Sequence, residues 1–71
     1  MRIPKTTETP RYYVATSDTE AFSSWGTLAL ALDSLARLRF FAPQDASMVI
    51  GVIETGPSGH VATHASKEPM P

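Results

Sequence analysis

The sequence predicts a single α+β domain with the order β-α-β-β, in which a three-stranded sheet carries one amphipathic helix packed on one face. Three observations lead to this prediction. A run rich in aromatic and β-branched residues occupies 11–16, a stripe of leucines spaced three or four apart follows, and two short apolar runs flank a turn near the end. These features indicate one strand, one helix and one hairpin.

The first strand is expected at 11–16, where RYYVAT combines residue types that favour extended backbone. A polar cluster, TSDTE, follows this run and ends at residue 20. Short polar side chains of this kind commonly cap helices. The candidate caps are Ser17 and Asp18 for an early helix start and Ser23 and Ser24 for a later one.

The helix is expected at about 24–41, because apolar side chains recur there at helical spacing. The stripe consists of Trp25, Leu28, Leu32, Leu35 and Leu38. Leu30 points away from this stripe on a helical wheel. Two arginines, Arg37 and Arg39, lie in the last turns, where positive charge suits the helix dipole, and Pro43 ends the helix.

The second and third strands are expected at 47–55 and 60–64. The turn between them, GPSG, has proline at its second position and glycine at its fourth, as a β-turn prefers. Residues 11–64 are therefore expected to form the domain. The polar, proline-containing ends at 1–10 and 65–71 are expected to be flexible tails.

Composition restricts the function classes. The chain has 71 residues, no cysteine and a formal net charge of −1. The absence of cysteine excludes disulfides and fits a cytoplasmic location. The balanced charge argues against nucleic acid as a partner, since phosphate contacts supply most of the affinity of nucleic-acid binders and these usually carry a basic excess. No stretch reaches the roughly 18 apolar residues of a membrane span, and no signal peptide is expected.

No catalytic, cofactor-binding or metal-binding residues can be assigned, so we expect a protein that is not an enzyme and that carries no cofactor. Its two histidines, His60 and His64, are expected on a strand, too far apart to hold one ion. The closest carboxylates, Asp18 and Glu20, are better explained by capping than by paired acid–base chemistry.

Both faces of the predicted sheet are apolar, and one helix covers only one of them. The residues expected on the uncovered face are Tyr12, Val14, Val49 and Ile53. A protein partner or a second copy of the chain is expected to cover this face, because leaving it wet forfeits roughly 1.5–3 kcal/mol per large side chain. The alternative is that a tail folds over it, with contributions from Met1, Ile3 and Met70.

Five residues are the candidate protein-binding site. Phe41 stands beside Arg37 and Arg39, and an exposed aromatic flanked by arginine is typical of a binding hot spot. The alternative for Phe41 is a hydrophobic plug at the helix exit. On the sheet, Val49 and Ile53 are the candidates for self-association as a homodimer.

The element order, written as YYVAT, LALALDSLARL and MVIGVIETGPSGHVATH, resembles small accessory proteins of phages and mobile elements, and some anti-CRISPR proteins are similar in size and build. The resemblance implies an inhibitor that binds a host protein complex and does no chemistry.

The same order also resembles the dodecins, in which a sheet wraps a helix and a flavin lies between symmetry mates. That resemblance implies, as the alternative function, an oligomeric small-ligand binder. The characteristic tryptophan of the second strand is missing here, and Trp25 stands near the predicted helix start instead. A nucleic-acid-binding module is the third alternative.

Overall fold

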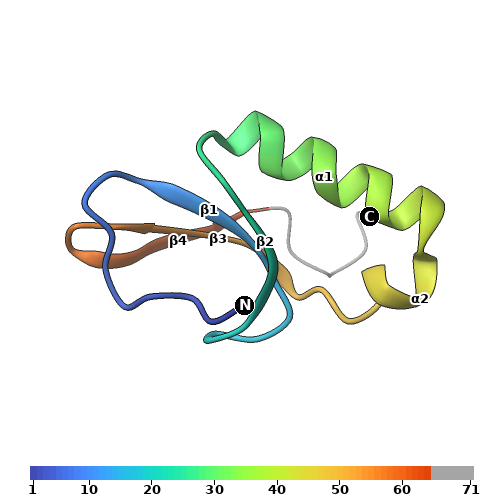
Figure 1. The fold of residues 1–71 in the computed structure, drawn as a ribbon, viewed down its shortest axis with the longest axis horizontal. Coiled ribbons are helices and arrows are strands. Elements are labelled where there is room, and N and C mark those ends of the chain that lie inside the picture. Colours follow the sequence, from blue (N-terminus) through green and yellow to red (C-terminus); the bar gives the residue numbers. More distant parts are fainter. Residues whose placement is uncertain (65–71) are drawn as a thin grey trace.

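The computed structural model describes residues 1–64. It confirms the α+β class and shows four strands and one main helix (Figure 1). In chain order the elements are β1 (Arg11–Ala15), β2 (Ala21–Trp25), α1 (Leu28–Phe41), the short helix α2 (Pro43–Ala46), β3 (Gly51–Gly56) and β4 (Gly59–His64). The predicted count of three strands and the β-α-β-β order are therefore wrong by one strand.

The four strands form one antiparallel sheet in the order β2-β1-β3-β4. Two hairpins, β1–β2 and β3–β4, make its two halves, and β1 pairs with β3 at the centre. The connection through α1 takes the chain from the edge strand β2 across to β3. Consequently β2 and β4 are the two edges of the sheet.

The additional strand β2 replaces the predicted beginning of the helix. The polar cluster before it forms a turn, in which the Ser17 hydroxyl accepts the amide N–H groups of Thr19 and Glu20 at 3.2 and 3.1 Å. Such a turn uses Ser17 to reverse a strand rather than to cap a helix. Trp25 then pairs with Tyr12 of β1. Its side chain reaches the helix-side core from the sheet and not from α1.

Helix α1 begins four residues later than expected. Thr27 is its N-cap, and the Thr27 hydroxyl accepts the amide N–H of Leu30 at 3.2 Å. The exit lies where the sequence predicts, because α1 ends at Phe41 and Pro43 opens α2. The strand predicted at 47–55 starts only at Gly51, since the amide of Val49 still donates to the carbonyl of Ala46 in α2.

One face of the sheet packs against α1, which lies over β2, β1 and β3 and not over β4 (Figure 1). The buried side chains of this helix-side core are Val14, Ala31, Leu35, Val49 and Val52. Within the stripe predicted for the helix, Leu35 is 2% exposed, whereas Leu32 is 37% exposed. The stripe therefore predicted the helix but not every one of its buried positions.

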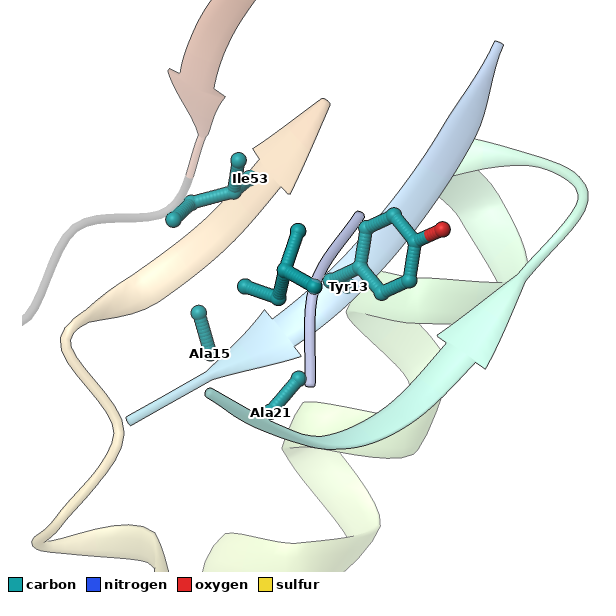
Figure 2. Packing of buried hydrophobic residues seen from close by; sticks show 5 residues of the cluster. Tyr13, Ala15, Ala21 and Ile53 are labelled. Atoms are coloured by element: carbon teal, nitrogen blue, oxygen red, sulfur yellow. The ribbon is translucent and has the colours of Figure 1, made fainter. Parts of the chain in front are cut away.

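The opposite face is covered by the N-terminal segment of the same chain. Figure 2 shows Tyr13, Ala15, Ala21 and Ile53 together on this face, where they form a buried cluster with Ile3. Residues 1–10, predicted to be a tail, thus lie against the sheet. The alternative in which a tail covers the second face is the arrangement observed for Ile3, whereas Met1 stays exposed. Met70 and the tail predicted at 65–71 lie outside the described residues.

Backbone hydrogen bonds hold this segment in place. The amide of Ile3 donates to the carbonyl of Thr19 at 2.8 Å, and the amide of Ala21 donates to the carbonyl of Met1 at 2.8 Å. Further along the segment, the amide of Thr7 donates to the carbonyl of Gly56 at 3.1 Å. The segment is therefore attached to both halves of the sheet. Within residues 1–64, no helix has the length and apolar character needed to cross a membrane.

Candidate functional site

The two residues predicted to mediate self-association are inside the protein. Val49 and Ile53 are each 3% exposed. Val49 packs under α1 in the helix-side core, and Ile53 packs beneath the N-terminal segment. The sequence-based prediction placed both on one open face because it extended the strand alternation back to residue 47. Strand β3 begins only at Gly51. Val49 therefore does not follow the alternation of the strand and lies on the opposite side of the sheet from Ile53.

The aromatic pair at the end of α1 is exposed. Phe40 and Phe41 are 79% and 77% exposed, with ring centroids 4.9 Å apart and ring planes at 80°. This edge-to-face contact orders the two rings with respect to each other. A plug at the helix exit would be buried, and Phe41 is not. We call Phe40 and Phe41 the aromatic pair.

The two arginines beside the aromatic pair lie on different sides of α1. The Nε of Arg37 is 3.0 Å from the Oδ2 of Asp33, one helical turn earlier, and these side chains are 74% and 59% exposed. Arg39 lines a separate hollow of about 270 Å³ with residues of and after α2, among them Pro43 and Val49. Arg37 and Phe41, in contrast, line the same hollow.

That shared hollow belongs to a longer groove between α1 and the edge strand β2. One part, of about 330 Å³, lies between Phe22 and Phe41, with the buried Val14 among the residues that line it. A second part, of about 300 Å³, lies between Trp25 and Leu30. Ser34 and Arg37 line both parts, so the two parts adjoin each other along α1. We call this feature the β2–α1 groove, with Phe22, Trp25, Leu30, Ser34, Arg37 and Phe41 as its defining residues.

The sequence explains how this groove arises. Residues 30, 34, 37 and 41 recur at helical spacing and therefore share one face of α1. Leu30, which the helical wheel set apart from the core stripe, is 50% exposed on that face. On β2, a register shift opposite the junction of Val14 and Ala15 adds Phe22 as an extra residue, which is 43% exposed. Such a bulge redirects the side chain it inserts.

Sequence reasoning identified Arg37 and Phe41 and missed Phe22 and Leu30 as residues of one site. Phe22 was missed because the residues of β2 were expected to belong to the start of the helix or to the loop before it. The available signal was Leu30, an apolar side chain off the core stripe that lies one turn before the half-buried Ser34 and two turns before the exposed Arg37. An exposed leucine by itself is common, so this signal acquires meaning only once β2 is placed beside it.

A cluster of Tyr12, Glu54 and His64 lies on the part of the sheet that α1 does not cover. The Nε2 of His64 is 3.0 Å from Oε1 of Glu54, and the ring of Tyr12 lies 6.2 Å from the His64 ring. His60 pairs with Thr55 and His64 with Val52, so the register shift between them puts the two histidines on opposite faces. Within residues 1–64, no three His, Asp or Glu side chains form a group that could hold a metal ion.

No protein-family model, no curated protein and no solved structure matches this chain.

Proposed function

We propose that the protein is a non-enzymatic protein-binding module, and that it binds through the aromatic pair and the adjoining β2–α1 groove. The observation that carries the proposal is the exposure of Phe40 and Phe41, 79% and 77%, at the mouth of an apolar groove. Aromatic residues with a neighbouring arginine are the residue types that dominate binding energy at protein interfaces.

The energetics favour a bound state for this surface. Burying one large apolar side chain removes it from water with a gain of roughly 1.5–3 kcal/mol. The aromatic pair contributes no such gain to folding, because both rings lie in solvent in the single chain. A partner that covers both rings, together with Phe22 and Leu30, recovers that free energy on binding. The same contact removes an apolar patch of the kind that promotes aggregation.

The test is affinity capture from the native host with mass spectrometry, using the intact chain and the double variant Phe40→Ser/Phe41→Ser. The matched control is Val61→Ser, since Val61 is also an exposed apolar residue, at 60%, but lies on β4. We expect the intact chain and the control to capture the same protein and the double variant to lose it. Equal capture by all three would overturn the assignment of the binding surface.

The identity of the captured protein tests the more specific proposal, that the chain is a phage-type inhibitor of a host protein complex. A subunit of a defence complex would support an anti-CRISPR-like role. The flavin alternative rested on a resemblance to the β-α-β-β order, whereas this chain has two strands before α1. We therefore put protein binding before the small-ligand and nucleic-acid alternatives.

A further inference from the structure

We propose that a second copy of this chain fills the β2–α1 groove, so that two copies form a two-fold dimer with their β2 strands paired at Ser24. This inference rests on the proposed protein-binding function and names the partner of the same site. It is carried by three features: a free strand edge, a self-complementary pattern of charges on α1, and the spacing between helix and edge.

The outer edge of β2 is only half occupied. The N-terminal amine of Met1 donates to the carbonyl of Ala21 at 2.7 Å, and the amide of Ala21 donates to the carbonyl of Met1. Beyond Ala21, β2 forms no backbone hydrogen bond on its outer side with any residue in 1–64. The N-terminal segment therefore leaves the second half of β2 open as a strand edge.

The open half presents the backbone groups of Ser24. The carbonyl of Ala15 accepts the amide of Ile50 on the β3 side of β1, so Val14, one residue earlier, faces β2. Val14 is opposite Ser23. By the alternation of an antiparallel ladder, Ser23 directs its backbone groups inward and Ser24 directs its N–H and C=O outward. Two Ser24 residues related by a two-fold axis can exchange both hydrogen bonds with each other.

The position of Ser24 along the groove also fits such a two-fold axis. Trp25 lines the groove with Leu30 and Asp33, whereas Phe22 lines it with Phe41. Ser24 lies between the two β2 residues, and is therefore level with the middle of this helix face.

A two-fold axis through Ser24, perpendicular to the sheet, runs the two α1 helices side by side in opposite directions. Asp33 and Arg37, which already form an ion pair within each chain, then each face the opposite charge of the other copy and form a network of four charges. Leu30 of each copy faces the aromatic pair of the other. The face reads apolar, acidic, basic, apolar from Leu30 through Asp33 and Arg37 to Phe41. Two copies of this helix face therefore match only when the helices are antiparallel, because a parallel arrangement would place Arg37 of one copy opposite Arg37 of the other.

The spacing leaves room for large side chains between the two helices. Paired strands lie about 4.8 Å apart, so the two β1 strands of such a dimer would be about 14 Å apart and the two β2 strands about 5 Å apart. Helix α1 lies over β2, β1 and β3 and is centred near β1, which sets the two helix axes roughly 14 Å from each other. Directly packed helices are separated by about 8–10 Å, so apolar side chains must occupy the additional width. The side chains of Phe22, Leu30 and Phe41 are the ones that fill the space between them.

The experiment is the mass of the full chain in solution, measured by light scattering or sedimentation over a concentration series. We expect the mass of two chains, falling to one on dilution. Arg37→Asp makes the helix face acidic throughout and Asp33→Arg makes it basic throughout. Both side chains are mostly exposed, so both variants are expected to fold, as circular dichroism would show. Each variant alone is expected to dimerise at least about tenfold more weakly.

Mixing the two variants is the decisive measurement. Each basic chain then faces an acidic one, so the mixture is expected to regain the dimer mass. As a test of the strand edge, Ser24→Pro removes an outward N–H that no residue in 1–64 uses, and edge strands accept proline at such positions. We expect this variant to be folded and monomeric.

Two results would overturn the dimer. The first is an intact chain that stays monomeric at every concentration. The second is a dimer that neither charge variant weakens, which would place the contact elsewhere. The protein-binding function has its own readout: a monomeric chain whose capture of a host protein still depends on Phe40 and Phe41 disproves only the dimer, and a dimer that captures no host protein disproves only the external partner.

Discussion

Each face of the sheet has a buried core, but the two cores are covered by very different pieces of chain. On one face, α1 supplies Ala31 and Leu35 to a core that also contains Val14 and Val52. On the other, an irregular segment supplies a single buried side chain, Ile3, to a cluster around Tyr13 and the residues near it. A helix brings a side chain to the sheet at every turn, whereas an extended segment brings one residue and must be held by backbone hydrogen bonds.

The comparison shows how a small chain can form a buried core on each face of its sheet from its own residues. Domains this small bury only about 60% of the surface of the unfolded chain. Here the N-terminal segment covers one face because Met1 is hydrogen-bonded to Ala21 at the edge of β2 and Ile3 to Thr19 in the turn before β2. Part of the apolar surface that stays exposed lies at the β2 edge and at the end of α1, where Phe22 and the aromatic pair are found.

The largest expected effect is on the helix side. Leu35 is 2% exposed and is among the largest fully buried side chains. Replacing Leu35 by Ala leaves a cavity between α1 and the sheet, and such changes cost about 2–5 kcal/mol. Urea denaturation should show a loss of stability in that range. The control is Leu32→Ala on the same helix, where the side chain is 37% exposed, and we expect it to lower the free energy of unfolding less than Leu35→Ala does; equal losses would contradict the core assignment.

The next effect is on the face covered by the N-terminal segment. Ile3→Ala removes the only side chain that this segment buries there, and we expect a loss of about 2 kcal/mol, at the low end for such truncations because the segment can shift. The exposed Met1→Ala is the control and should lie within about 0.5 kcal/mol of the intact chain. A dye that binds exposed apolar surface should report Ile3→Ala and not Met1→Ala. An unchanged stability would mean that the segment does not protect this face.

The periodicity of apolar residues was enough to predict β1 and α1, but not β2 or the position of the N-terminal segment. In β1, alternation correctly separates Tyr13 and Ala15 from Tyr12 and Val14, because strand side chains have a period of two. The leucine stripe predicted α1 in the same way. Neither pattern depends on distant parts of the chain, which is why both could be predicted.

The elements that were missed either depend on contacts between residues distant in sequence or are themselves too short to show a periodic pattern. Strand β2 has five residues, and Trp25 at its end happens to fit the helical spacing of the leucines. The role of Ile3 depends on Thr19 and Ala21, and a lone isoleucine in a polar, proline-containing stretch has no local pattern. For the candidate site, Phe41 could be identified locally, whereas Phe22 is brought to it only by the path of β2.

A smaller effect, on the helix side alone, is expected from the N-cap. The Thr27 hydroxyl satisfies the amide of Leu30, which has no partner within the helix. Thr27→Ala should lower stability by about 1 kcal/mol, and Thr27→Ser should restore most of it, because serine caps at least as well. If Thr27→Ala proved neutral in chemical denaturation, water would satisfy the first turn equally well.

The smallest expected effect has the opposite sign and lies at Thr55 on β3, which shares the face of Ile53 beneath the N-terminal segment. Thr55 is fully buried, and its hydroxyl has no hydrogen-bond partner. A buried hydroxyl without a partner is costly, and valine has the same shape without that group. Thr55→Val should therefore raise the free energy of unfolding by about 0.5–1 kcal/mol. Thr55→Ser keeps the hydroxyl and removes a methyl group, so it should lower stability instead. A loss of stability in Thr55→Val would show that the hydroxyl is hydrogen-bonded in solution, and that the sheet beneath the N-terminal segment is less dry than the one beneath α1.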